Sequence, residues 1–207
     1  MKQFLIATTN PAKLEELKSG LKSLEKRGIE VLTLNDVKVG ENHPVENGKT
    51  FQENALIKAK FYASLTHLPC LSDDGGLIIP YLNNEPGVKS RRWPGYEATD
   101  EELINLTFKR LNKAKGEQRT AYLETCLVFF VPSHPKGDQV IFEQEKIKGH
   151  IAEKPSGKPT HGYPYRAIFI VDEFNKYYDE LTEIEHQKIN HRLKALKRLT
   201  KKILSVL

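Results

Sequence analysis

The sequence predicts an α/β fold in which helices flank a mixed, twisted central sheet. Two observations indicate this fold. Short apolar runs typical of buried strands alternate with segments whose apolar residues recur at helical spacing. Two long strand-like runs, 120–131 and 140–148, are joined by a short turn and are therefore expected to pair antiparallel. Because the 207 residues contain no linker and no internal repeat, we expect one domain spanning residues 1–207.

Several predicted elements begin at residues with a recognised local role. Asn10 before Pro11 fits the start of a helix, with asparagine as the N-cap and proline at the first helical position. Thr99 and Glu102 have the spacing of a capping box. In chain order, the expected elements are a strand at 4–7, a helix from 11, a strand at 31–34, a helix from 51, a strand ending at 71, a strand at 77–82, a helix after 99, the pair 120–131 and 140–148, a strand at 167–171 and a basic amphipathic helix entered at 191.

Composition limits the classes to which the chain can belong. The formal net charge of +5 is modest, so we expect no nucleic-acid partner and interpret the lysines of the last helix as a solvated face. No run approaches the roughly 18 consecutive apolar residues of a membrane span, and the N-terminal residues lack the features of a secretory signal. Cys70 and Cys126 lie in apolar runs and are expected to be buried, reduced thiols. We therefore expect a cytoplasmic protein without membrane contact.

The four residues Asp73-Asp74-Gly75-Gly76 follow a short apolar run and are interpreted as a turn. Neighbouring carboxylates raise one another's pKa unless a cation or hydrogen-bond donors offset the repulsion. One interpretation is a divalent cation such as Mg²⁺, which proteins typically hold with one or two carboxylates and the phosphate oxygens of a substrate. The alternative is an ordinary surface turn.

The turn after the first predicted strand is a candidate phosphate site. Thr8, Thr9, Asn10 and Lys13 place two hydroxyls, an amide and a cation at a helix N-terminus. The unpaired N–H groups and the dipole of such a terminus favour an anion. The alternative is that Asn10 only caps the helix and that Lys13 faces solvent.

Other charged residues allow a functional and a structural interpretation. Glu46 lies in a long polar loop at 35–49, whereas Glu53 lies in the first turn of a helix, where a carboxylate complements the helix dipole. Arg91 and the pair His191-Arg192 could bind phosphate or stack on a base. Each of these basic residues could equally be a surface side chain.

Taken in order, these segments resemble the inosine triphosphate pyrophosphatase family, enzymes that remove non-standard purine nucleoside triphosphates. The similarity spans essentially the whole chain. The matching motifs are Thr8-x-Asn10-x-x-Lys13-x-x-Glu16, Thr50-Phe51-x-Glu53-Asn54-Ala55-x-x-Lys58-Ala59, Asp73-Asp74-x-Gly76-Leu77, Pro86-Gly87-Val88-x-Ser90-x-Arg92, Gly162-Tyr163-x-Tyr165-x-x-Ile168-Phe169 and His191-Arg192.

The resemblance implies an elongated α/β protein with a substrate cleft between two lobes, usually a homodimer. It implies Mg²⁺-dependent hydrolysis of ITP, dITP and XTP to the monophosphate and pyrophosphate. Carried over by position, Asp74 is the catalytic base and a metal ligand, Glu46 is the second metal carboxylate, and Glu53 and Asp73 are further candidate ligands. The residues assigned to the substrate are Thr8, Thr9, Asn10, Lys13, Lys58 and Arg91 at the triphosphate, and Tyr163, Tyr165, Arg166, His186, His191 and Arg192 around the base.

Four positions depart from the family pattern. Gly75 replaces a serine and offers the substrate only a backbone N–H, while Arg91 replaces an alanine. Arg166 replaces a carboxylate that contacts the base, and His186 replaces a lysine. Three hypotheses follow: an Mg²⁺-dependent pyrophosphatase for non-standard purine nucleotides, a nucleotide-binding or regulatory homologue without turnover, and a pyrophosphatase for modified pyrimidine nucleotides.

Overall fold

The computed structural model describes residues 2–37, 39–40, 43–160 and 162–207. Within these residues the strands form one eight-stranded sheet in the order β2-β1-β3-β5-β6-β7-β8, with β4 paired to β3. The predicted mixed sheet is confirmed, because β1 pairs parallel with β2 and β3, whereas β6 and β7 pair antiparallel. The strands are β1 (Lys2–Ala7), β2 (Ile29–Thr33), β3 (Cys70–Ile79), β4 (Glu85–Pro86), β5 (Thr120–Val131), β6 (Gln139–Ile151), β7 (Phe169–Val171) and β8 (Lys176–Tyr177).

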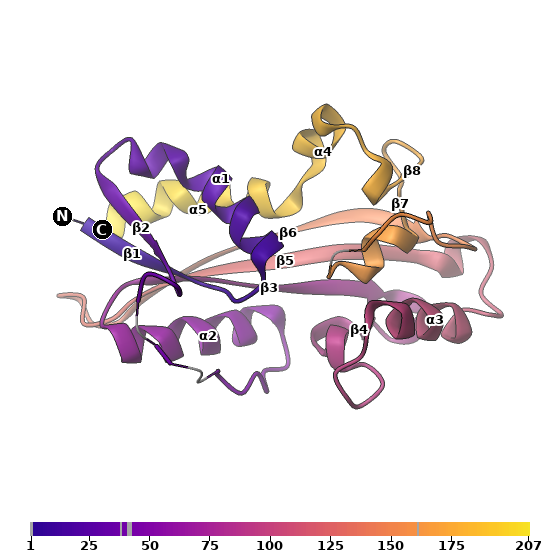
Figure 1. Ribbon diagram of the computed structural model, residues 1–207, viewed down its shortest axis with the longest axis horizontal. Helices are drawn as coiled ribbons and strands as arrows, with labels where there is room; N and C mark the ends of the chain where they lie inside the picture. The colour runs from indigo at the N-terminus through magenta and orange to yellow at the C-terminus, as the bar shows by residue number, and fades with distance from the viewer. Residues whose placement is uncertain (1, 38, 41–42, 161) are drawn as a thin grey trace. The chain divides into compact units, whose positions relative to one another are not determined.

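Helices alternate with strands from β1 to β5, as predicted, whereas β6 follows β5 directly and β8 follows β7 (Figure 1). The α-helices are α1 (Pro11–Glu25), α2 (Phe51–Thr66), α3 (Asp100–Arg110), α4 (Glu183–Ile189) and α5 (His191–Val206). The 3-10 helices are η1 (Pro80–Leu82), η2 (Gly87–Arg92), η3 (Gly116–Arg119), η4 (Pro164–Ile168) and η5 (Tyr178–Glu180). No helix among the described residues is both long enough and apolar enough to cross a bilayer.

The chain divides into two compact units, each with its own apolar core. Unit 1 contains residues 1–74, 125–145 and 191–207, and unit 2 contains residues 75–124 and 146–190. Strands β3, β5 and β6 contribute residues to both units.

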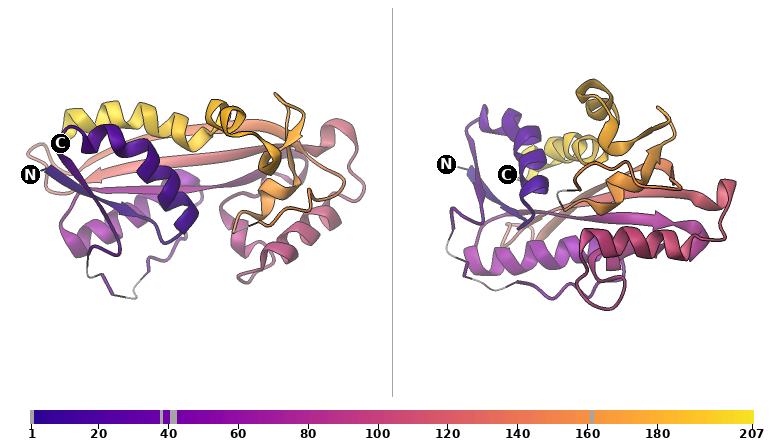
Figure 2. Two further views of the ribbon diagram at one scale, coloured as in Figure 1. Left: turned by 45° about the horizontal axis from the view of Figure 1, so that its top comes forward. Right: turned by 45° about the vertical axis from the view of Figure 1, so that its right-hand side comes forward.

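In unit 1, helices cover both faces of the sheet. Helices α1 and α5 lie side by side on one face, and α2 covers the other (Figures 1 and 2). The core under α1 and α5 includes Phe4, Leu17, Phe129 and Leu196, all of which are almost completely buried. The apolar spacing predicted for the first and last helices therefore marks the faces that pack on the sheet.

Local signals fix where the first two helices begin. The Asn10 side chain accepts hydrogen bonds from the backbone N–H groups of Ala12 at 3.0 Å and Lys13 at 3.1 Å, which confirms the predicted N-cap. Thr50 caps α2 by accepting from Glu53 N at 3.1 Å. The buried thiols are also confirmed, because Cys70 and Cys126 are free and buried, and burial raises the pKa of Cys70 to about 12.

The predicted turn at Asp73-Asp74-Gly75-Gly76 is wrong, because β3 runs without interruption from Cys70 to Ile79. Backbone pairing with β1, in which Ala7 lies opposite Ser72, carries the strand up to the two aspartates. Neither Gly75 nor Gly76 has a positive φ, so these glycines do not act as turn residues here. Sheet pairing therefore overrides the local turn preference of the sequence.

In unit 2, α3 and the 3-10 helix η4 pack against one another beside the remaining parts of the sheet. The predicted capping box of α3 is confirmed, since Thr99 accepts from Glu102 N and Glu102 accepts from Thr99 N. The strand predicted at 77–82 ends at Ile79, because Pro80 has no N–H for a ladder and opens η1. Helix α4 was not predicted, although Thr182 and Glu185 form the same type of capping box.

Candidate active site

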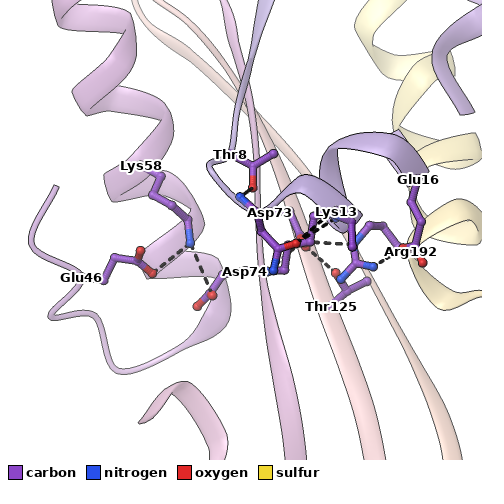
Figure 3. Close-up of polar contacts among 11 residues, drawn as sticks. Thr8, Lys13, Glu16, Glu46, Lys58, Asp73, Asp74, Thr125 and Arg192 are labelled. Atoms are coloured by element: carbon purple, nitrogen blue, oxygen red, sulfur yellow. Dashed lines mark hydrogen bonds and ion pairs between the residues drawn. The ribbon is translucent and has the colours of Figure 1, made fainter. Parts of the chain in front are cut away.

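The two aspartates of β3 lie in different environments within unit 1. Successive side chains of a strand point to opposite faces of the sheet. Asp73 contacts α1 and α5, whereas Asp74 contacts a lysine of α2 (Figure 3). The Asp73 side chain is completely buried, and 13% of the Asp74 side chain is exposed. The strand thus separates two adjacent carboxylates that would repel one another in a turn.

Asp73 is surrounded by donors. Its Oδ1 accepts a hydrogen bond from the Thr125 hydroxyl at 2.5 Å. Its Oδ2 lies 3.0 Å from Lys13 Nζ and 3.1 Å from Arg192 Nε. Burial alone would raise the pKa of Asp73, but Arg192, Lys13 and the Thr125 hydrogen bond outweigh burial and hold the pKa well below its usual range. Both oxygens of this ionised carboxylate are therefore engaged by protein groups.

Arg192 links three elements of unit 1. It lies in the first turn of α5, its side chain is only 5% exposed, and it pairs with Glu16 of α1 as well as with Asp73 of β3 (Figure 3). The sequence-based assignment of Arg192 and its neighbour His191 to the base stays a prediction. The structure places the Arg192 guanidinium between the buried carboxylate of Asp73 and the half-buried carboxylate of Glu16, where it fixes the start of α5 against β3. Glu16 was quoted only as part of a motif, although its position three residues after Lys13 puts both on one helix face.

Lys58 joins Asp74 to Glu46. Its Nζ lies 2.9 Å from Glu46 Oε2 and 3.4 Å from Asp74 Oδ1 (Figure 3). Burial would lower the pKa of Lys58, but the charges of Asp74 and Glu46 raise it, so the ammonium form is favoured. The loop carboxylate and the strand carboxylate are therefore neighbours, as the metal-site hypothesis requires.

Asp74 carries an unsatisfied oxygen. Its Oδ2 is buried and has no hydrogen-bond partner among the described residues. Burial raises the pKa of Asp74, and the negative charges of Glu46 and Asp73 raise it further, against the opposing effect of Lys58 and Lys13. An under-coordinated carboxylate oxygen of raised basicity is suited to accept a proton or to bind a cation.

The donor set at Asp74 and Glu46 fits a hard divalent cation that also binds substrate. No group of three or more His, Cys, Asp or Glu side chains in the part of the chain that the structure describes is arranged to hold a metal ion. Two carboxylates alone would leave most coordination positions to water or to phosphate oxygens, which is the usual arrangement for Mg²⁺. The other candidate ligands fit less well, because Asp73 is fully engaged and Glu53 is exposed and accepts from Lys49 N at 2.5 Å.

The start of α1 brings the predicted phosphate residues together. Lys13 does not face solvent, because its side chain is 16% exposed and pairs with Asp73 (Figure 3). The alternative interpretation of Lys13 as a solvent-facing residue is therefore wrong, whereas Asn10 does act as the cap. The Thr8 hydroxyl accepts from Asn10 N at 3.3 Å, and Thr9 is exposed. An exposed hydroxyl, a helix N-terminus and a nearby ammonium group can together bind an anion.

In unit 2, three residues assigned to the base lie in one cluster. The Arg166 guanidinium lies over the Tyr163 ring at 3.7 Å and over the Tyr178 ring at 4.8 Å from the centroid. The Tyr178 hydroxyl lies 3.0 Å from His186 Nε2. Sequence reasoning missed Tyr178, which contacts both Arg166 and His186. Tyr165 is buried and donates to the backbone oxygen of Ser90 at 3.0 Å, so it supports the backbone of η2.

Arg91 of η2 has a carboxylate partner that sequence reasoning also missed. Its Nη1 lies 2.6 Å from Oδ1 of Asp100, the first residue of α3. A carboxylate in the first turn of a helix is commonly explained by the helix dipole, and no spacing rule connects residue 91 with residue 100. The pair could have been found only from the fold. Gly75 directly follows Asp74 in β3.

Comparison with known proteins identifies relatives over nearly the whole chain. The model of the Ham1 family matches residues 4–202. A protein of Bacillus subtilis named dITP/XTP pyrophosphatase is 38% identical over 201 residues, which cover 97% of this chain and 96% of that protein. A Thermus thermophilus protein of the same name is 40% identical over 195 residues, covering 94% and 88% of the two chains.

Solved structures show the same similarity. A HAM1 protein from Coxiella burnetii is 33% identical and superposes with a TM-score of 0.83, covering 99% of this chain and 100% of the other. A structure from Mycobacterium abscessus, described as a nucleoside-triphosphatase or dITP/XTP pyrophosphatase, is 35% identical with a TM-score of 0.76. That alignment covers 95% of this chain and 97% of the other.

Proposed function

The chain belongs to the Ham1 family, and from this premise we propose that it hydrolyses non-standard purine nucleoside triphosphates (dITP, ITP and XTP) to the monophosphate and pyrophosphate. It is a hydrolase of phosphorus anhydrides. The resemblance to inosine triphosphate pyrophosphatases is thereby confirmed, since relatives named dITP/XTP pyrophosphatase align over nearly the whole chain.

One observation carries the proposal: Asp74 keeps a buried oxygen without a hydrogen-bond partner in the described structure, beside Glu46 and Lys58. Hydrolysis to pyrophosphate requires water to attack the α-phosphorus. A base must therefore lie close to the water, and the anionic oxygens must be neutralised. Asp74, with its raised pKa, is the base in this proposal, and Lys13 and Lys58 supply positive charge to the phosphates.

We propose Mg²⁺ as the cofactor, held by Glu46 and Asp74. The unpartnered Asp74 Oδ2 and the oxygen-only donor set support this choice. Bound there, the ion would neutralise phosphate oxygens and acidify the attacking water. Residues of the chain have the other roles in this proposal. Asp73 holds Lys13 in place, Asp74 receives the proton of the attacking water, and the N-terminus of α1 binds the phosphate groups.

The direct test is a product assay over a panel of nucleotides. Orthophosphate is measured with and without added inorganic pyrophosphatase, which converts any released pyrophosphate to orthophosphate. Each assay is run with and without Mg²⁺. The panel contains XTP, dITP, ITP, ATP, GTP and modified pyrimidine triphosphates. We expect metal-dependent pyrophosphate from XTP, dITP and ITP. Orthophosphate as the only product would contradict the mechanism, nucleotide binding without product would favour a regulatory homologue, and faster turnover of pyrimidines would favour the third hypothesis.

The base-side residues yield a first prediction about specificity. Arg166 carries five N–H donors and no acceptor, so its guanidinium matches the oxo groups of xanthine and hypoxanthine better than the amino group of adenine. We predict that Arg166→Gln lowers kcat/KM for XTP and dITP by about 10- to 100-fold, because a charged hydrogen bond contributes on the order of 1.5–3 kcal/mol. The rate with ATP, which we expect to be low, should change little.

The control for this prediction is Lys188→Gln. Lys188 is also on the surface of unit 2 and pairs with Glu173, so this variant removes one positive charge without altering the Tyr163 and Tyr178 rings around Arg166. Steady-state rates with XTP, dITP and ATP should match the unmodified protein. Equal losses with all three nucleotides in Arg166→Gln would show that Arg166 does not read the base.

We further propose that residues 1–207 act as one functional domain, in the cytoplasm, as a homodimer and on free nucleotides rather than nucleic acid. The match of the family model to residues 4–202 supports the single functional domain. The basic face of α5 is partly neutralised, because Arg198 pairs with Glu143 and Glu145, and Lys202 pairs with Glu143. This pairing argues against a nucleic-acid surface. Light scattering coupled to gel filtration tests the dimer.

A further inference from the structure

The carboxylate of Asp100 joins two segments of unit 2. Its Oδ1 forms the ion pair with Arg91 Nη1 at 2.6 Å. Its Oδ2 accepts hydrogen bonds from the Thr160 hydroxyl and from Gly162 N, the latter at 3.0 Å. One side chain at the start of α3 therefore connects η2 with the loop that leads to Tyr163. A helix-dipole role alone would require none of these contacts.

The ion pair with Asp100 restricts where the Arg91 guanidinium lies, while much of the Arg91 side chain remains in solvent. Nη1 also donates to the backbone oxygen of Ala98 at 3.1 Å, so the nitrogen that pairs electrostatically with Asp100 is held by a hydrogen bond to the backbone as well. On the other side of the group, the Gly162 backbone has φ +83°, and a Cβ at that position would lie 3.7 Å from Arg91 Nη2. The Arg91 side chain nevertheless remains 42% exposed. It is an oriented cation that a solvent-borne anion can reach.

Stability is a weak explanation for this arrangement. An ion pair with an arginine this exposed typically contributes little to stability, because water screens the charges and two side chains lose freedom. Orientation is a stronger explanation. The guanidinium is a planar fork that binds phosphate well only when its N–H groups point in the required directions.

We infer that Asp100 is a positioning residue, which is held by Thr160 and Gly162 and in turn orients Arg91 toward the substrate. The inference rests on the proposed function, because it takes Arg91 as a cationic contact of the triphosphate. Asp100 itself touches no substrate in this account. Its removal should weaken substrate binding through Arg91 and leave the chemical step at Asp74 intact.

The test is a double-mutant cycle with Asp100→Asn, Arg91→Met and the combined variant. We expect each single substitution to raise KM for XTP about 10-fold with kcat within about twofold, since loss of one charge-assisted contact costs about that factor. The combined variant should be no worse than the worse single variant. Arg91→Lys keeps the positive charge but loses the planar guanidinium, and it leaves Asp100 unchanged. It therefore tests the need for an oriented guanidinium even if Asp100→Asn does not fold. It should raise KM nearly as much as Arg91→Met.

The matched control is Asp179→Asn. Asp179 Oδ2 accepts from the Ser156 hydroxyl at 2.7 Å, so this residue holds an earlier part of the same loop by a contact of its own. Its KM and kcat should equal those of the unmodified protein. An unchanged KM in Asp100→Asn, additive losses in the combined variant, or an equal rise of KM in Asp179→Asn would each overturn the inference.

Binding can be measured independently of turnover. Trp93, the sole tryptophan of the sequence, lies two residues after Arg91 and is 6% exposed. Its fluorescence can report titration with XTP in the absence of divalent metal, and Asp100→Asn should raise the Kd about 10-fold. If the unmodified protein binds XTP but releases no pyrophosphate, the proposed function fails. The Kd values of the same variants, compared in a double-mutant cycle, then still decide the role of Asp100. If it turns XTP over and the cycle is additive, only the role of Asp100 fails.

Discussion

Asp74→Asn should lower kcat for XTP by about 1,000-fold or more and leave the fold intact. Loss of a general base typically costs about 100- to 10,000-fold, and the amide also binds a divalent cation less well than a carboxylate. The substitution preserves size and leaves one side-chain oxygen for Lys58, which lies 3.4 Å from Asp74 Oδ1. We therefore expect an unchanged circular dichroism spectrum beside a near-complete loss of pyrophosphate release.

Substitutions of two other carboxylates separate this effect from a general loss of negative charge. Glu46→Gln should raise the Mg²⁺ concentration needed for half-maximal rate, because Glu46 is the second ligand in our proposal. Glu53→Gln should have little effect, since Glu53 is exposed and accepts a hydrogen bond from Lys49 N at the start of α2. Full activity in Asp74→Asn, or a loss in Glu53→Gln as large as in Asp74→Asn, would refute the assignment of the base.

Signals in neighbouring residues predicted where helices begin. The positions of the site residues, in contrast, depend on pairing between segments that are distant in the sequence. Asn10 and the Thr99–Glu102 capping box could be read from neighbouring residues, because a cap involves only three or four positions. The course of β3 could not be read in this way. Asp73, Asp74 and two glycines have strong turn preferences, and only the neighbouring strands hold them extended.

The partners of the two aspartates could not be predicted from spacing. Arg192 lies 119 residues from Asp73 in the sequence, and no local rule relates the two. The motif resemblance indicated that Lys13, Asp74 and Glu46 matter, but it grouped Asp73 with Asp74 as a candidate ligand. The strand places their side chains on opposite faces, and this placement separates a buried anchor from a reactive carboxylate.

Asp73→Asn should lower the free energy of unfolding by about 3–5 kcal/mol, because it leaves the buried Arg192 and Lys13 without their shared carboxylate. Urea denaturation followed by circular dichroism measures the change. The pH dependence has a defined sign. The pKa of Asp73 is lowered in the folded protein, so its stabilisation is present above the unfolded pKa of about 3.9 and is lost as pH falls toward the folded value.

The control for this prediction is Asp138→Asn, in the exposed turn between β5 and β6, which should change the free energy of unfolding by less than about 0.5 kcal/mol.

Arg192→Met should also lower the free energy of unfolding. Combining it with Asp73→Asn should lower that free energy by less than the sum of the two single effects, because both remove the same ion pair. If the two losses in free energy of unfolding were strictly additive, Asp73 and Arg192 would not stabilise the fold through a shared ion pair. Since Asp73 also holds Lys13, Asp73→Asn should reduce activity under conditions where it remains folded, which would connect the buried anchor to catalysis.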